Sequence, residues 1–168
     1  RLQADAVING REFVYGLPEL QREKIKAVNN IANPGCFATT IQLGLLPLAK
    51  AGLLTDVYTT GITGSTGAGQ SLAATSHFSW RANNVQAYKT LTHQHNAEIL
   101  QSVNSFQSAL SLNEEGFNFV PWRGDFTRGI FISSQIKCDV SLEELNVLYT
   151  WARKILRDKP RMLQGCVC

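Results

Sequence analysis

The sequence predicts an α+β domain in which a mixed, largely antiparallel sheet is covered by helices on one face. The 168 residues are 44% hydrophobic and 17% charged, which is typical of a globular domain. Segments rich in β-branched residues alternate with segments of helical periodicity. Their order is strand, helix, strand, long loop, helix, strand, strand, helix, which favours one sheet with helices packed on it.

The first third of the chain is predicted to lead through a turn into a long apolar helix. Pro18 and Glu19 suit the first turn of a short helix, and Pro34-Gly35 is typical of a turn. Gly52 stands where a glycine commonly ends a helix. Residues 1–12 are mixed polar, and no helix or strand is predicted there. The predicted elements are a strand or loop over 13–17, a helix over 18–25, a buried strand over 27–32 and a helix over 36–51.

The remaining elements follow from β-branched segments and one helix cap. Ser141 and Glu144 have the spacing of a capping box, which predicts the start of the last helix. The predicted elements are a strand over 56–63, a glycine-rich loop over 64–69, an irregular stretch over 76–89, a helix over 92–103, strands over 117–121 and 128–138, and a helix from 141 to about 157.

Composition argues against several classes of protein. The net charge is +3 with scattered Lys and Arg, which does not favour a nucleic-acid partner but suits an acidic substrate. The four cysteines form no Cys-x-x-Cys pair, so we expect no metal site, no disulfide framework and a reducing, cytoplasmic setting. No secretory signal and no apolar run of membrane length is present, so no membrane partner is expected.

Cys36 is the leading candidate for chemistry. It follows a Pro-Gly turn and precedes a helix, where unpaired N–H groups and the helix dipole stabilise a thiolate. The alternative is a small buried apolar residue, which describes most single cysteines. The position at a helix start favours covalent chemistry at sulfur.

His93 and His95 are the candidates for proton transfer to and from a reactive thiol. They are two of three histidines, and histidine is the usual acid or base near neutrality. Residues two apart on a helix point about 200° apart, so both cannot face one sulfur unless one precedes the helix. The third histidine, His77, is interpreted as a surface or packing residue.

Two further segments suit the binding of anions. The loop from Gly64 to Gly69 follows a strand and suits a cofactor phosphate, an anionic substrate or a plain turn. No acidic residue follows at the distance expected for dinucleotide binding. Arg123 and Arg128 flank a turn and are either solvated charges or a fork that holds a substrate carboxylate or phosphate.

The motifs, in the order in which they occur along the chain, resemble those of N-acetyl-gamma-glutamyl-phosphate reductases. The resemblance covers about residues 13–150 and is more specific as a set than in any single motif. It rests on Tyr15-Gly16-Leu17-Pro18-Glu19-Leu20, Asn33-Pro34-Gly35-Cys36, the loop Gly64-Ser65-Thr66-Gly67-Ala68-Gly69, Tyr88 with His93-Gln94-His95-Asn96-Ala97-Glu98-Ile99, and Pro121 with Arg128-Gly129-Ile130.

The resemblance implies NADPH-dependent reduction of an acyl phosphate to a semialdehyde in arginine biosynthesis, on the fold of reductases similar to glyceraldehyde-3-phosphate and aspartate-semialdehyde dehydrogenases. Cys36 would displace phosphate to form a thioester, and His93 or His95 would move the proton. Further implied roles are substrate binding by Arg123, Arg128, Tyr88 and Ser65, and cofactor binding by Gly64, Gly67 and Gly69.

Several positions depart from the family pattern. Gln94 stands where Arg is usual, Ala97 where Pro is usual and Phe37 where Tyr is common, and the turn after Pro121 lacks a usual His. These changes are compatible with a different acyl group, such as succinyl in place of acetyl.

The chain starts without an initiator Met, and the family's N-terminal cofactor domain would precede Arg1. We therefore expect residues 1–34 to be the end of the cofactor-domain region and 35–168 to be a catalytic and dimerisation domain. Such a chain is predicted to form a homodimer or homotetramer and to be inactive alone. The alternatives are a binding or oligomerisation module without activity, and a nucleotide binder that uses Gly61–Gly69.

Overall fold

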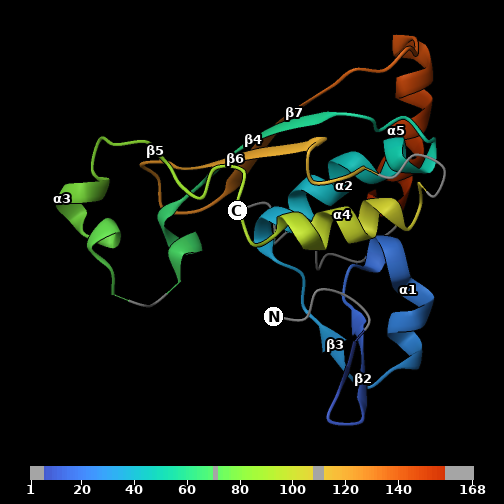
Figure 1. The fold of residues 1–168 in the computed structure, drawn as a ribbon, viewed down its shortest axis with the longest axis horizontal. Helices are drawn as coiled ribbons and strands as arrows, with labels where there is room; N and C mark the ends of the chain where they lie inside the picture. Colours follow the sequence, from blue (N-terminus) through green and yellow to red (C-terminus); the bar gives the residue numbers. More distant parts are fainter. Residues whose placement is uncertain (1–5, 70–71, 108–111, 158–168) are drawn as a thin grey trace.

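The computed structural model describes residues 6–69, 72–107 and 112–157. They form two sheets, a four-stranded sheet in the order β5-β6-β4-β7 and a three-stranded sheet in the order β1-β2-β3. Figure 1 shows the larger sheet above helices α2 and α4, with the smaller sheet and α1 below them. The end of the chain, with Cys166 and Cys168, lies outside the described residues.

The four-stranded sheet is mixed, as the sequence predicted. Its central strand β4 (Val57–Thr63) pairs in parallel with β6 (Phe117–Arg123) and antiparallel with β7 (Ile130–Ile136). The short β5 (Gln86–Ala87) pairs antiparallel with β6. The α+β fold prediction is therefore confirmed.

One face of this sheet is covered by three helices. These are α2 (Cys36–Lys50), α4 (Asn96–Asn104) and α5 (Leu142–Arg157). The strand residues that point toward them, such as Val57, Phe117 and Phe119, are buried in the main hydrophobic core. The alternate residues of β4, such as Tyr58 and Thr60, are exposed on the other face, because successive side chains of a strand point to opposite sides.

Helix α2 packs tightly on the sheet at Gly61. A Cβ at this position would lie 2.6 Å from the Phe37 ring and 2.7 Å from Ile132 Cδ1. Only a residue without a side chain allows this approach. Phe37 directly follows Cys36, so this contact fixes the start of α2 against the sheet.

The smaller sheet corrects two sequence predictions. Strands β1 (Ala6–Ile8) and β2 (Arg11–Tyr15) form a hairpin, although only a strand or loop from Phe13 on was expected here. Its turn, Asn9-Gly10, has φ of 50° and 73°, and Asn-Gly is the preferred pair for a two-residue hairpin turn.

The predicted buried strand over 27–32 is also wrong in extent. Helix α1 (Pro18–Ala27) runs into it, and only β3 (Ile31–Ala32) is a strand, paired in parallel with β2. Ile31 is 48% exposed, so one of the two β3 side chains lies at the surface.

The segment between β4 and α4 projects beyond the sheet. It contains two single-turn 3₁₀ helices, η1 (Ser65–Ala68) and η2 (Ala74–Ser76), and the short helix α3 (Phe78–Arg81), seen at one end of Figure 1. Because α4 begins at Asn96 and not near Thr92, His93 and His95 both precede the helix. Positive φ at Lys89 and Leu91 turns the chain sharply just before them.

The other predicted helices and strands agree with the structure to within about two residues. The capping box is present, because Ser141 N–H donates to Glu144 Oε2 at 2.8 Å and Glu144 N–H donates to Ser141 Oγ at 3.2 Å. Among the described residues, the helices are too short or too polar to cross a bilayer.

Candidate active site

The site is built around the first residue of α2. Cys36 follows the extended residue Gly35 (φ −69°, ψ 152°), which is the N-cap of the helix. The Cys36 thiol is free and exposed to solvent. The alternative of a buried apolar cysteine is therefore wrong, and the sulfur is accessible to a substrate.

His95 packs directly on the turn that carries the thiol. A Cβ at Gly35 would lie only 2.2 Å from His95 Nε2, so the glycine leaves the space that the imidazole occupies. The ring itself is buried, with 3% of its surface exposed. The residue before the nucleophile candidate and the imidazole are thus in contact, although 60 positions separate them in the sequence.

His93 lies behind His95 in an aromatic pocket. Its Nδ1 accepts the His95 backbone N–H at 3.2 Å, which leaves the ring proton of a neutral His93 on Nε2. Three aromatic rings pack edge-on against the His93 ring, with centroid distances of 5.7 Å to Phe37, 5.8 Å to Tyr88 and 5.4 Å to Phe119. His93 therefore positions the segment that carries His95.

A buried carboxylate, to which no role was assigned from the sequence, binds the same turn. Glu98 is 6% exposed, and its Oε1 accepts the Gly35 N–H at 2.8 Å and the Tyr15 hydroxyl at 2.6 Å. Gln42 Nε2 also donates to the Tyr15 oxygen at 2.8 Å. Burial, and then the bond to Glu98, raises the pKa of Tyr15 above its ordinary value of 10.0.

This network joins the smaller sheet and two helices to the turn that carries the thiol. Tyr15 comes from β2, Gln42 from α2 and Glu98 from the first turn of α4. Glu98 follows His95 by three residues, so the two lie on the same side of the helix start. That spacing was the only signal in the sequence for the role of Glu98.

Tyr88 connects the histidines to Arg123. The Arg123 guanidinium carbon lies 4.4 Å from the centroid of the Tyr88 ring, a cation–π contact. Burial raises the pKa of Tyr88, the positive charge of Arg123 opposes that rise, and the charge of Cys36 adds to it. Tyr88 thus lies within electrostatic reach of both the thiol and the arginine.

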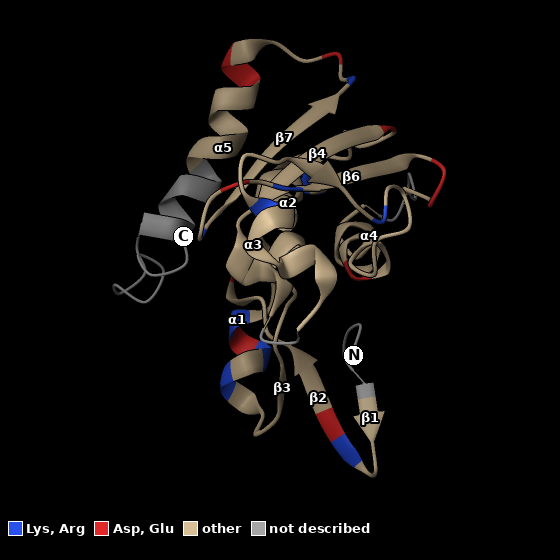
Figure 2. Ribbon diagram, turned by 90° about the vertical axis from the view of Figure 1, so that its left-hand side faces the viewer, with Lys and Arg blue, Asp and Glu red and all other residues tan. Residues whose placement is uncertain are grey.

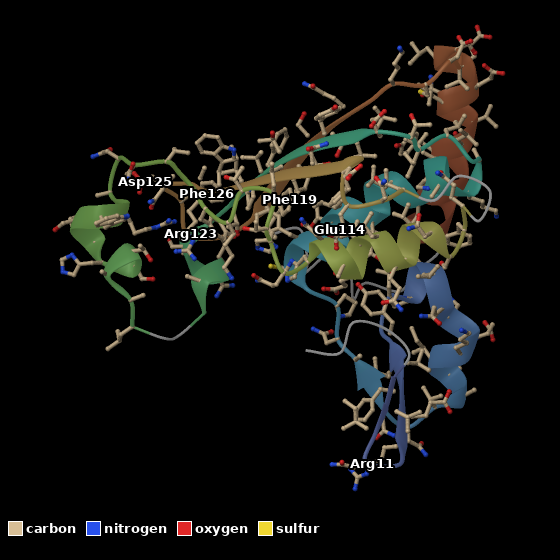
Figure 3. The ribbon with its side chains drawn as sticks, viewed as in Figure 1. Arg11, Glu114, Phe119, Arg123, Asp125 and Phe126 are labelled. Carbon is tan, nitrogen blue, oxygen red and sulfur yellow. The ribbon has the colours of Figure 1, made fainter. Side chains whose placement is uncertain are left out.

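Arg128 is placed differently from Arg123. Its side chain is exposed and makes no hydrogen bond or ion pair with any residue that the structure describes. Figure 3 shows Arg123 with Asp125 and Phe126 at the end of the sheet from which the projection extends. The predicted fork between the two arginines stays a prediction.

The glycine-rich loop packs against the turn that follows β6. The N–H groups of Gly64, Ser65 and Thr66 donate to the carbonyls of Gly129, Phe126 and Thr127, and those of Gly67 and Gly69 donate within the loop. These five N–H groups are already bonded, so they do not fit a nucleotide phosphate. The assignment of Gly64, Gly67 and Gly69 to the cofactor stays a prediction.

Within the described ranges, no group of three or more His, Cys, Asp or Glu side chains is placed to hold a metal ion. The arrangement is an exposed thiol at a helix start whose preceding residue contacts His95, with His93, Tyr88 and Arg123 following in successive contact. Together with the mixed sheet and its single helical layer, it defines a thiol-bearing α+β domain.

The chain belongs to the family described as "Semialdehyde dehydrogenase, dimerisation domain", whose model matches residues 36–159. The crystal structure of aspartate semialdehyde dehydrogenase II from Vibrio cholerae is similar in fold, with a TM-score of 0.60 over 83% of this chain and 49% of that chain. Since the two sequences are only 14% identical, this likeness concerns the fold alone.

Curated relatives are closer in sequence. The chain is 54% identical over 150 residues to the N-acetyl-gamma-glutamyl-phosphate reductase of Flavobacterium johnsoniae, covering 89% of this chain and 45% of that protein. It is 57% identical over 139 residues to the reductase of the same name from Phocaeicola vulgatus, covering 82% and 42%. The chain thus spans less than half the length of the curated relatives that it matches.

Proposed function

We propose that this chain carries the acylation site of an N-acyl-gamma-glutamyl-phosphate reductase acting in arginine biosynthesis. The observation that supports this most directly is the contact between His95 and the turn that holds the exposed Cys36. The names of the curated relatives supply the substrate class, an acyl phosphate of N-acylated glutamate.

The reaction proposed for these residues is a thioester-forming displacement. The Cys36 sulfur attacks the acyl carbon, the carbon–sulfur bond forms, and the carbon–oxygen bond to phosphate breaks, releasing inorganic phosphate. His95, which packs on the Gly35 turn that carries the thiol, takes the thiol proton and returns it to the departing phosphate. The first N–H groups of α2 stabilise negative charge on the carbonyl oxygen. The substrate's other groups are assigned to Arg123, Tyr88, Ser65 and Arg128.

Reduction of the thioester is assigned to NADPH, which supplies hydride when bound. Because the loop N–H groups from Gly64 to Gly69 are largely bonded within the protein, we derive no step through this cofactor from the described residues. The predicted cytoplasmic location is likewise part of the proposal.

The uncovered sheet face is proposed as a homodimer interface. It carries only uncharged side chains, among them Tyr58 at 56% and Phe131 at 65% exposure. Figure 2 shows no Lys, Arg, Asp or Glu on β4 or β7. An exposed apolar patch of this kind favours association, and the matching family model is that of a dimerisation domain.

Acylation can be tested without the hydride donor. The chain is mixed with N-acetyl-gamma-glutamyl phosphate, generated from N-acetylglutamate and ATP by a carboxylate kinase, and acid-quenched peptides are analysed by mass spectrometry. We expect an acyl group on Cys36 and release of phosphate. Cys36→Ser should abolish both, while Cys138→Ser should change neither.

An unmodified Cys36 would contradict the proposal and favour the alternative, a binding or oligomerisation module without activity. Since the matched part is under half of the curated relatives, we predict that the 168 residues alone do not reduce the acyl phosphate with NADPH. Reduction at an ordinary enzymatic rate would overturn that prediction.

A further inference from the structure

Arg81 lies at the candidate site although its sequence position indicated no role. It ends α3, on the projection, and its side chain reaches back toward the sheet. Its Nη2 donates to the Gly124 carbonyl at 2.7 Å and to Ser65 Oγ at 3.3 Å. Gly124 follows Arg123 directly, so the two arginines converge on the same turn from different elements.

Both guanidinium groups are held by neutral oxygen atoms. Arg123 Nη1 donates to Thr75 Oγ1 at 3.1 Å, and its plane lies over Tyr88. Neither arginine forms an ion pair with a carboxylate in the part of the chain that the structure describes. Asp125, the nearest acidic residue in sequence, instead accepts the Asn83 N–H at 2.6 Å. Two half-buried positive charges therefore stand together without a protein counter-ion.

The arginine pair and the thiol both affect the pKa of the Tyr88 hydroxyl. Burial has the largest effect and raises this pKa. The charges of Arg123 and Arg81 lower it, and the charge of Cys36 raises it. The Tyr88 ring also packs edge-on against His93. Tyr88 thus lies within electrostatic reach of the nucleophile and of both arginines.

We infer that Arg81 is a specificity-determining residue that, with Arg123, binds the α-carboxylate of the N-acylglutamyl substrate. The inference rests on the proposed function. The substrate is anionic at both ends, and its phosphate end must lie at Cys36, so its α-carboxylate needs a cationic partner at the other end. An arginine N–H that binds a carboxylate forms a charge-assisted hydrogen bond. In the part of the chain that the structure describes, Arg81 makes its side-chain hydrogen bonds through Nη2, which leaves Nε and Nη1 as charged donors for the substrate.

The test uses protection of Cys36 from iodoacetamide, mapped by peptide mass spectrometry. Two ligands are compared: N-acetyl-L-glutamate, and 4-acetamidobutanoate, which is the same molecule without the α-carboxylate. In Arg81→Gln we expect protection by N-acetyl-L-glutamate to require about ten- to a hundredfold more ligand, as for a lost charge-assisted bond. Protection by 4-acetamidobutanoate should not change, and Arg81→Lys should recover part of the affinity.

The control is Arg11→Gln, an exposed arginine at the tip of the β1–β2 hairpin, far from Arg123 in Figure 3, which should leave both ligands unaffected. Three results would mean that Arg81 only supports the turn, and each would overturn the inference. They are an equal loss of protection by both ligands, no loss of protection by either, and slower labelling of the unliganded variant. If neither ligand protects the wild-type thiol, the proposed function itself fails.

Discussion

Gly35 is the residue on which the relation between the thiol and His95 depends most directly. Its N–H bonds to Glu98, its carbonyl accepts the Thr39 N–H in the first turn of α2, and its missing side chain admits the imidazole. A buried acceptor, a helix start and an acid–base candidate therefore meet at one residue.

We predict that Gly35→Ala slows alkylation of Cys36 by iodoacetamide about ten- to a hundredfold. The new Cβ would lie 2.2 Å from His95 Nε2, so the ring must move, and a displacement of about 1 Å can cost about a hundredfold. Gly44→Ala on the same helix is the control, because its Cβ would meet no atom within 4 Å. Labelling of Gly35→Ala at the wild-type rate would contradict the role of this contact.

From the raised pKa of Tyr15 we predict that the chain loses stability at alkaline pH. Its folded-state pKa is raised, so its contribution is complete below the ordinary value of 10.0 and declines as pH rises above that value toward the folded pKa. We expect the free energy of unfolding in urea to fall by up to about 1.4 kcal/mol per pH unit from this group. Tyr15→Phe should show a shallower fall between pH 9 and pH 11, in steps of about half a unit. Parallel curves for the two proteins would refute the assignment.

At the scale of elements, the packing of α2 on β4 brings the thiol to its place. Phe37 fills the space above Gly61 and also contacts Phe119 and His93. The first turn of the helix is therefore held by the sheet on one side and by the segment before α4 on the other. This explains how a helix start can be both exposed at its first residue and fixed at its second.

Gly61→Ala should destabilise the chain by about 1–3 kcal/mol, as overpacked core sites do. The Cβ would lie 2.6 Å from the buried Phe37 ring and 3.1 Å from Phe119, neither of which can rotate away freely. Gly44→Ala, whose Cβ would meet no atom within 4 Å, should not destabilise the chain. The stability of both variants is measured as the shift of the denaturant midpoint at an unchanged slope of free energy against denaturant concentration. Similar midpoints for the two variants would show that α2 does not press on β4 here.

At the scale of the whole molecule, the sheet has two unlike faces. One carries α2, α4 and α5, and on the other no helix or strand of the described residues covers β4 and β7 (Figure 1). The site lies at the end of the sheet where the projection begins, and not on the uncovered face. Association through that face therefore leaves Cys36 accessible.

We predict that Phe131→Asp, on β7, converts a dimer into a monomer, because it buries a charge in an apolar contact. Val7→Asp changes an equally exposed apolar residue of β1 in the other sheet and should keep the wild-type mass. Light scattering after size-exclusion chromatography measures the molar mass. A wild-type monomer, or a dimer of Phe131→Asp, would contradict the proposed interface.

Local signals in the sequence predicted much of the fold. Periodicity placed α2 and α5 within a residue or two, and the Pro-Gly turn placed Cys36 at a helix start. The hairpin at Asn9-Gly10 was missed although its turn signal is local, because only three apolar residues, Ala6 to Ile8, precede the turn in a segment of mixed polarity. The start of α4 was placed too early, because His93 and His95 continue the helical pattern while their rings pack against other elements.

By itself the sequence determined that a thiol begins a helix and that two histidines stand close to the start of another, because turns and caps depend on neighbouring residues. Only the tertiary structure decided that His95 meets Gly35, that Glu98 binds its N–H from 63 residues away and that Arg81 joins Arg123. The physical reason is that these contacts depend on how α2, α4 and the projection pack on one sheet. Their residues have no periodicity or spacing in common that a single sequence could display.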